Sequence, residues 1–562
     1  MRALRTVISL MQSFWDDTEA ARCANELDLR VYTSHLLGRE PSLVLHGGGN
    51  TSVKTVEHAE QRLCVKGSGA DLAHVTAKDF TPLRLEEVKR LIALTDLDNE
   101  ALMAAVSTCV AESGRPRPSI ETLLHAVLPY KFVEHTHADS VLALTNTANG
   151  ARVAAEVFGT LAPLVPFRHS GFALAKACYE VFTTQGTADT IGLILLHHGV
   201  FAFGHTARDS YENMVRLVTL AEEYLQRHGA WRLPTDDAPE RWTPAEIARL
   251  RRDISRTAGF PLVLKLQDSA ECRAFARRPD LPALCGEGPA TPQHAVFAKR
   301  LPMLGRDVGR YADDYAAYIA TYRPGKSLAS LRLDAAPRVV IDADFGIWTA
   351  GMDAHYAHIT GEIFQHDMEI MTRASAHDRY AGLPPADVLD AEIHYGGFES
   401  RMRESQSDAV ALLGEVVLAA GPARGFEKAI SRALLARGAA VGVLGGDSQS
   451  KSDAELCLNE FDPDAALRTL VRRFGGLDVL VLRPGFESWL AVCTDVLSAA
   501  PRGARVVLIG PKQWCERMRK SAEKHPLSVR ALGLQLKPEG NEASIAENVA
   551  RLCISGLQGV EP

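Results

Sequence analysis

The sequence predicts an α/β protein that is built from several domains. Its 562 residues correspond to three or four domains at about 150 residues each. Short apolar strands alternate with glycine turns and helical periodicity, as in residues 191–204 and the helix expected at Asp209–Gln226. A strand, a glycine turn and a helix follow Glu415 and lead to a second strand at Ala440–Leu444, which is typical of a βαβ unit.

The composition places the chain among ordinary globular proteins. Hydrophobic residues make up 46% and charged residues 23%, which excludes a mainly disordered, collagen-like or coiled-coil chain. The formal net charge of −7 argues against a general nucleic-acid or membrane-surface binder. The ten cysteines form no C-x-x-C pair, so we expect a reduced, cytoplasmic chain. No apolar stretch approaches the roughly 18 residues of a transmembrane helix, and we identify no signal peptide.

Changes in pattern along the chain predict four segments. Residues 1–10 are expected to be an extension, and a first domain covers residues 11–235. A proline-containing, charged linker at Leu233–Thr243 leads to a middle α/β domain at residues 244–400. The last domain is expected at residues 411–562.

An internal repeat is one interpretation of a pattern shared by the first and middle domains. The segment Leu195–Gly204 has a counterpart 147 residues later, at Asp342–Gly351, and each precedes an expected helix. Both contain Gly-x-x-x-x-Gly with an apolar–aromatic pair after the first glycine. The alternative is chance similarity between two strand–turn–helix units. In this alignment His198 corresponds to Phe345, so the second copy would lack the role of His198.

Three small, polar turns in the first domain favour an anion site. The run His46–Ser52 contains three consecutive glycines, whose backbone N–H groups can approach an anion closely. The turn Lys66–Asp71 adds a cation beside small residues. Ser119 is expected to cap a helix that starts near Glu121, and a helix N-terminus favours anions. Each turn alone is more often structural, but three in one domain are more informative.

The sharpest chemical signal is a pair of histidines on one strand. In the expected strand 132–137, His135 and His137 lie two residues apart and therefore share a face. The pair His197–His198, which follows the strand 191–196, is the natural source of a third ligand. Three neutral imidazoles with an open position form a Lewis-acid metal site, whereas the alternative is a hydrogen-bonded surface pair. Three further histidines are expected not to be ligands: His125, His169 and His205.

Glu121 is the candidate acid–base residue. A carboxylate near a divalent ion can take a proton from a substrate carbon or oxygen. A glutamate in the first turn of a helix more often only complements the helix dipole. The catalytic interpretation therefore depends on the neighbouring metal site.

The motifs that carry these residues occur in the order typical of a known family. They are HGGGNTSVK at 46–54, VKGSGAD at 65–71, RPSIETLLH at 117–125, HTH at 135–137 and HG at 198–199. Over residues 11–230 the chain thereby resembles the class II aldolase/adducin superfamily. More narrowly, it is similar to the long bifunctional rhamnulose-1-phosphate aldolase/alcohol dehydrogenase proteins. The resemblance implies a class II aldolase-like α/β/α fold for the first domain. Under the repeat interpretation, the middle α/β domain is a degenerate, aldolase-like copy of it.

The resemblance also implies roles for individual residues. It places zinc, or another divalent metal, on His135, His137 and His198, with Glu121 as the catalytic acid–base. One departure is Ile120, where short aldolases of the superfamily often have a second serine. Four residues would bind the substrate phosphate: Asn50, Ser68, Gly69 and Ser119.

The reaction that the resemblance implies is cleavage of a ketose 1-phosphate, rhamnulose-1-phosphate-like, to dihydroxyacetone phosphate and an aldehyde. The metal would stabilise the negative charge of the enediolate, and Glu121 would handle the proton. The superfamily also includes adducin, which keeps the fold without the enzyme, so a non-catalytic scaffold or sensor is the alternative. A homo-oligomer is expected, with a phosphorylated sugar as substrate and neither nucleic acid nor membrane as partner.

The last domain resembles a short-chain dehydrogenase/reductase domain whose motifs are altered. Gly421 and Gly425 stand in the glycine turn of a Rossmann-like fold, with Asp447 placed as a ribose-binding acid, so NAD would use these three residues. Glu427 replaces the third small residue and would repel the cofactor phosphates. No tyrosine follows Tyr395, so the Tyr-x-x-x-Lys proton donor is missing. We therefore expect a truncated Rossmann-like domain without dehydrogenase activity; a bifunctional aldolase and NAD-dependent dehydrogenase is the further alternative.

Overall fold

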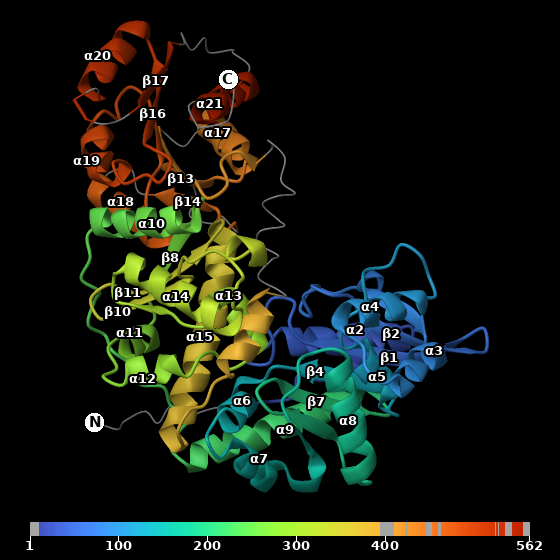
Figure 1. Cartoon of the computed structure of the whole chain (residues 1–562). Helices are drawn as coiled ribbons and strands as arrows, with labels where there is room; N and C mark the ends of the chain where they lie inside the picture. Colours follow the sequence, from blue (N-terminus) through green and yellow to red (C-terminus); the bar gives the residue numbers. More distant parts are fainter. Residues whose placement is uncertain are drawn as a thin grey trace, which may run out of the picture. The chain divides into compact units, whose positions relative to one another are not determined.

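The computed structural model describes residues 10–393, 410–421, 425–444, 452–458, 462–522, 524–525, 528–533 and 542–554 (Figure 1). The chain divides into two compact units. The first unit comprises Met1–Leu233 together with two later segments, Glu287–Gln293 and His366–Asp387. The second unit comprises Pro234–Gly286, His294–Gln365 and Val388–Pro562.

A seven-stranded sheet in the order β3-β2-β1-β4-β7-β6-β5 forms the centre of the first unit. All neighbouring strands are antiparallel except β5 and β6. Because side chains alternate along a strand, Val200 and Ala202 pack against one helical layer, and Phe201 and Phe203 against the other. The strands are β1 (Asn50–Glu57), β2 (Glu60–Lys66), β3 (Phe80–Arg84), β4 (Phe132–Thr136), β5 (Leu164–Val165), β6 (Gly192–Leu195) and β7 (Gly199–Gly204).

Helices cover both faces of this sheet, which gives the α/β/α arrangement predicted from the sequence. One layer contains α2, α6, α7 and α9, and the other contains α3, α4, α5 and α8. The expected helix at Asp209–Gln226 is α9, which is opened by a capping box between Thr206 and Asp209. The helices are α1 (Asp17–Ala20), α2 (Glu26–Gly38), α3 (Leu85–Arg90), α4 (Asn99–Thr108), α5 (Thr122–Val127), α6 (Asp139–Thr145), α7 (Gly150–Phe158), α8 (Phe172–Gln185) and α9 (Ala207–Arg227).

A four-stranded sheet in the order β8-β11-β10-β9 follows in the chain and belongs to the second unit. Its strands are β8 (Val263–Gln267), β9 (Met303–Leu304), β10 (Val339–Asp342) and β11 (Gly346–Gly351). The helices of this region are α10 (Pro244–Ala258), α11 (Ala270–Ala276), α12 (Leu281–Gly286), α13 (Pro292–Ala298), α14 (Val308–Tyr322) and α15 (Ala354–His377).

This sheet repeats the topology of one half of the first sheet. The series β8-β11-β10-β9 pairs as β4-β7-β6-β5 does, with antiparallel neighbours except for the last, parallel pair. The hairpin β10–β11 and helix α15 begin 147 residues after β6–β7 and α9. A Cβ on Gly204 would lie 2.5 Å from the backbone N of Ser210, and one on Gly351 would lie 2.1 Å from that of Ala357, at the same offset. These matches favour a structural repeat over chance similarity.

The last part of the chain forms a six-stranded parallel sheet in the order β14-β13-β12-β15-β16-β17. Numbered along the chain, this order is 3-2-1-4-5-6, which is that of the doubly wound Rossmann fold. The α/β class is as predicted, but the sheet is not truncated, because all six strands are present. The strands are β12 (Val416–Ala420), β13 (Ala440–Leu444), β14 (Glu455–Leu458), β15 (Val479–Leu482), β16 (Arg505–Gly510) and β17 (Ser528–Gly533). The helices are α17 (Gly425–Leu435), α18 (Pro463–Phe474), α19 (Ser488–Leu497), α20 (Lys512–Ala522) and α21 (Glu542–Ile554).

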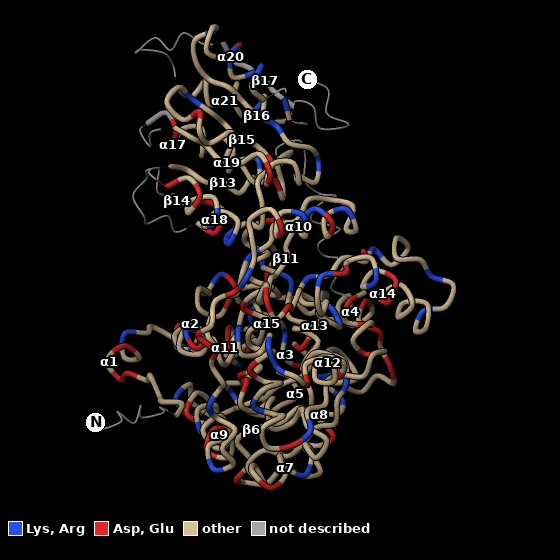
Figure 2. Tube along the Cα trace, turned by 90° about the vertical axis from the view of Figure 1, so that its left-hand side faces the viewer, with Lys and Arg blue, Asp and Glu red and all other residues tan. Residues whose placement is uncertain are grey.

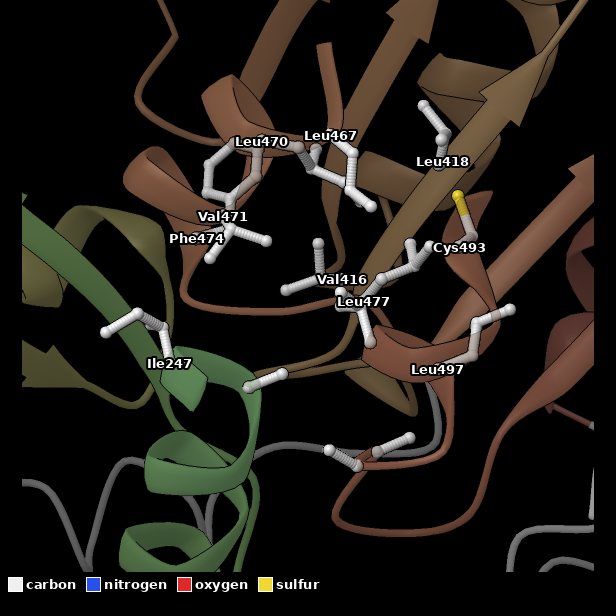
Figure 3. Close-up of a cluster of buried hydrophobic side chains, with 14 of the residues drawn as sticks. Ile247, Val416, Leu418, Leu467, Leu470, Val471, Phe474, Leu477, Cys493 and Leu497 are labelled. Atoms are coloured by element: carbon white, nitrogen blue, oxygen red, sulfur yellow. The ribbon is translucent and has the colours of Figure 1, made fainter. Parts of the chain in front are cut away.

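The core of the second unit runs through both of its sheets. Figure 3 shows Ile247 of α10 beside apolar side chains of the parallel-sheet region, among them Val416, Leu477 and Leu497. In the described part of the chain, basic and acidic residues are interspersed along the trace (Figure 2). Among the described residues, no helix combines the length and the apolar character that a membrane crossing requires.

Candidate metal centre

Three histidines of the first unit converge on one point. His135 lies on β4, His137 follows this strand directly, and His198 lies in the turn between β6 and β7. The Nε2 atoms of His135 and His137 are 3.1 Å apart, and one donor atom from each of the three rings lies within 4.8 Å of the others. Because β4 pairs with β7, the β6–β7 turn that carries His198 lies next to His135 and His137. This close packing requires a glycine at position 199, because a Cβ there would be 2.3 Å from the carbonyl oxygen of Thr136.

The hydrogen bonds of the first two rings leave both Nε2 atoms without a proton. Nδ1 of His135 lies 3.1 Å from the carbonyl oxygen of Val200, and Nδ1 of His137 lies 2.6 Å from Oε1 of Gln293, so each Nδ1–H donates. Burial lowers the pKa of His137 to about 4 and that of His135 well below its usual value, so both rings are neutral at pH 7. Two Nε2 lone pairs then face each other, an arrangement that a cation between them would stabilise. The donor set therefore fits a divalent metal.

The Glu121 carboxylate lies beside these histidines and is buried. Its Oε1 is 3.2 Å from Nε2 of His198, and its Oε2 is 3.6 Å from Nε2 of His135. Burial by itself would raise the pKa of Glu121, but the hydrogen bonds from Nε2 of His198 and from the Asn50 amide hold that pKa well below its usual value. Glu121 is thus a carboxylate at neutral pH, and Ser170 Oγ also donates to it at 3.2 Å.

Asn50, the first residue of β1, holds this carboxylate in place. Its Nδ2 donates to Oε2 of Glu121 at 2.6 Å and to Oγ of Ser119 at 3.2 Å. Its Oδ1 accepts a hydrogen bond from Nε2 of His125, whose Nδ1 is 2.8 Å from Oγ of Ser52. Burial lowers the pKa of His125 to about 3, so this ring is neutral. His125 therefore lies in a hydrogen-bond chain that orients Asn50, a role that its sequence context did not indicate.

The turns expected to bind phosphate lie next to one another in the first unit. The backbone N of Ser68 donates to the carbonyl oxygen of Arg117 at 2.8 Å. A Cβ placed on Gly69 would have no atom within 4 Å, so the space beside this glycine is open. A Cβ on Gly47 would be 2.8 Å from the Gly69 oxygen, so the glycine run and the second turn are in contact. Nζ of Lys66 donates to the carbonyl oxygen of Gly47 at 3.1 Å and links the two turns.

The predicted helix cap at Ser119 is wrong. Helix α5 begins at Thr122, and Glu121 rather than Ser119 is its N-cap residue. The carbonyl oxygen of Ser119 accepts from the backbone N of Thr122 at 3.1 Å in a turn that precedes the helix. The hydroxyl of Ser119 instead accepts hydrogen bonds from Asn50 and from the backbone N of Glu121. Ser119 is thus part of the network around the carboxylate.

The residues considered for NAD binding are only partly described. Gly421 follows β12 and Gly425 begins α17, whereas Asp447 lies outside the described residues. The Glu427 side chain is buried and forms an ion pair with Arg483. A Cβ on Gly421 would meet Oε1 of Glu427 at 2.8 Å and Cδ of Arg483 at 3.0 Å. The ion pair therefore lies directly against the first glycine of the turn.

Comparisons with known proteins identify the family of the chain. The family profile "Class II Aldolase and Adducin N-terminal domain" matches residues 29–225, and "Aldolase class II, second domain" matches residues 242–400. The N-terminal class II aldolase domain of a conserved protein from Thermoplasma acidophilum is 36% identical, over 38% of this chain and 99% of that chain, with a TM-score of 0.36. The chain belongs to the class II aldolase/adducin family. The family predicted from the motifs is thus confirmed.

Other relatives of this class II aldolase family member are more distant. The protein named "Uncharacterized oxidoreductase YuxG" from Bacillus subtilis (strain 168) is 27% identical over 529 residues, which cover 85% of this chain and 75% of the relative. L-fuculose-1-phosphate aldolase from Thermus thermophilus is 18% identical, over 36% of this chain and 93% of that chain, with a TM-score of 0.25.

Proposed function

We propose that this family member is a metal-dependent aldolase that cleaves a ketose 1-phosphate, of the rhamnulose-1-phosphate type, to dihydroxyacetone phosphate and an aldehyde. The observation that carries the proposal is the convergence of three imidazoles with a buried carboxylate 3.2 Å from one of them. Zinc is the metal that we assign, because a set of three imidazole ligands with an open position suits it.

The chain's own residues divide the work of the reaction. A bound divalent ion would act as a Lewis acid on the substrate oxygens. His135, His137 and His198 would hold that ion. Glu121 would exchange a proton with the carbon that becomes part of dihydroxyacetone phosphate, and Asn50 would keep the carboxylate aimed at that carbon. Ser68 and Gly69, which are exposed in the second turn, would bind the phosphate.

The rest of the chain is assigned no catalytic step. Phe345 occupies the position of His198 in the repeated hairpin, so the middle region lacks this ligand. The altered Rossmann-like domain lacks the tyrosine of a dehydrogenase. The alternative of a non-catalytic, adducin-type scaffold is less well supported, because a scaffold has no need of three imidazoles that converge beside a buried carboxylate.

Metal content tests the proposal first. Purified wild type is expected to hold about one zinc per chain, and the His135→Ala/His137→Ala variant is expected to lose it, because two of three ligands are removed. A matched control is His58→Ala/His74→Ala, whose imidazoles are exposed. Wild type that holds metal is then assayed for triose phosphate release from ketose 1-phosphates. Wild type that takes up no metal at neutral pH contradicts the aldolase.

A further inference from the structure

One residue outside the first family match contacts the metal centre directly. Gln293 lies near the start of α13, and the segment Glu287–Gln293 belongs to the first unit. Its Oε1 lies 2.6 Å from Nδ1 of His137, and its Nε2 donates to the carbonyl oxygen of Leu45 at 2.9 Å. The side chain also covers the glycine run, because a Cβ on Gly48 would be 2.6 Å from the amide nitrogen of Gln293.

These two hydrogen bonds determine which atom of the amide faces the imidazole. A carbonyl oxygen only accepts hydrogen bonds, so the group that faces Leu45 is the NH₂ of Gln293. The other end, Oε1, accepts and therefore requires a proton on Nδ1 of His137. That proton leaves Nε2 of His137, the atom that faces His135, with its lone pair free to bind a metal.

We propose that Gln293 is a positioning residue of the metal centre, which fixes the tautomer and the ring orientation of His137. The inference rests on one part of the proposed function, namely that the three histidines bind a metal. It does not depend on which sugar is the substrate. Partners of this kind hold the ring of a ligand and raise its basicity, and their loss typically weakens metal binding about 10–100-fold. The metal centre of the first domain is therefore completed by a residue that lies within the second family match.

The segment that carries Gln293 is held in place by other contacts. Nδ2 of Asn146 donates to the carbonyl oxygen of Ala290 at 2.7 Å, and the backbone N of Ala290 donates to Oδ1 of Asp367 at 2.9 Å. The hydroxyl of Tyr380 donates to the carbonyl oxygen of Gly288 at 2.9 Å. Because these contacts do not involve the Gln293 side chain, its replacement is expected to leave the segment in position.

The experiment compares two substitutions in the full chain, Gln293→Leu and Gln293→Glu. Zinc affinity is measured by competition with a chromophoric chelator, and the ligand field by the visible absorption of the Co²⁺ form. Gln293→Leu removes the acceptor, and we expect about 10–100-fold weaker zinc binding and an altered Co²⁺ spectrum. Gln293→Glu keeps an oxygen that accepts from Nδ1–H, so most of the affinity is expected to return. The control is Gln267→Leu, whose amide donates to Thr349 in the second unit.

Three results would overturn the proposal. Gln293→Leu that binds zinc as tightly as wild type shows that the contact does not matter. Equal loss in both variants, together with a lower melting temperature of the metal-free protein, shows that Gln293 only anchors its segment. Wild type without metal removes both this proposal and the proposed function. Wild type that binds zinc but releases no triose phosphate removes the aldolase alone, and the Gln293 comparison still decides the positioning role.

Discussion

At the scale of single residues, the site combines an ionised carboxylate with three converging imidazoles in a buried place. Glu121 keeps its charge because hydrogen bonds from His198 and Asn50 lower its pKa against the effect of burial. Burying an ionised carboxylate costs free energy unless neighbouring groups donate hydrogen bonds to it or pair with its charge. Such groups occur often at functional sites. The clustering of these residues is therefore stronger evidence for chemistry than any one of them.

Replacing Glu121 by Gln should separate proton transfer from metal binding. The amide cannot take up a proton, so exchange of the C–H hydrogens of dihydroxyacetone phosphate with deuterated water should slow about 10²–10⁴-fold. Zinc content should persist, because the three histidines remain. Exchange is followed by NMR, with Ser170→Ala as the control, since that variant removes only one donor to the carboxylate. Unchanged exchange in Glu121→Gln would assign the proton to another group.

The cluster of three histidines could be predicted from the sequence, but the hydrogen-bond partners of these histidines could not. The i, i+2 spacing of His135 and His137 is a local property of one strand, and a sequence displays it directly. Gln293 is 156 residues from His137, and no periodicity relates the two positions. The wrong cap at Ser119 has a similar cause, because a serine before an apolar run does not determine at which residue the turn becomes a helix.

At the scale of elements, long periodic segments were predictable and very short ones were not. The expected helix at Asp209–Gln226 differs from α9 by two residues at one end and one at the other, and the strand at Ala440–Leu444 agrees with β13. Strands β5 and β9 have only two residues each, too few to show alternation. They exist because each pairs in parallel with a longer strand, β6 or β10, and such pairing is a tertiary property.

The β12–α17 turn is expected not to bind NAD. The buried ion pair of Glu427 with Arg483 lies against Gly421, where a dinucleotide pyrophosphate would approach the backbone. Binding would break this pair and bury a pyrophosphate beside a carboxylate, which is unfavourable. Titration calorimetry of the full chain with NAD should therefore show a Kd weaker than about 1 mM. Saturable binding at micromolar concentrations would contradict this interpretation.

At the scale of the whole molecule, the two later parts of the chain share one core. Apolar residues of α10 and of the parallel-sheet region belong to the same buried cluster, and an ion pair joins them. The sequence predicted where segments begin and end, because composition and turn residues are local signals. It could not predict that two sheets share one core, because that core depends on contacts between residues far apart in the chain. Residues 244–400 and 411–562 remain our predicted domains. Apart from Glu287–Gln293 and His366–Asp387, which belong to the first unit, their described parts pack as one compact unit.

The pair of Arg251 with Asp478 is the polar centre of that shared core. Both side chains are 1% exposed, and the guanidinium reaches the two carboxylate oxygens at 3.0 and 2.7 Å. Arg251 also donates to the carbonyl oxygens of Leu262 and Gly414, and Asp478 accepts from the backbone N of Val416. The pair thus ties α10 to the residue before β8, to the start of β12 and to the residue before β15.

Asp478→Ala should therefore destabilise the second unit. The substitution leaves the Arg251 charge buried without its partner, and breaking a buried pair in this way costs about 3–5 kcal/mol. Differential scanning calorimetry should show an earlier transition for this unit. Zinc affinity should stay unchanged, because every residue of the metal centre belongs to the first unit. Asp495→Ala on α19, where the carboxylate is exposed, is the matched control. A melting profile equal to that of wild type would mean that apolar contacts alone hold α10 against the parallel sheet.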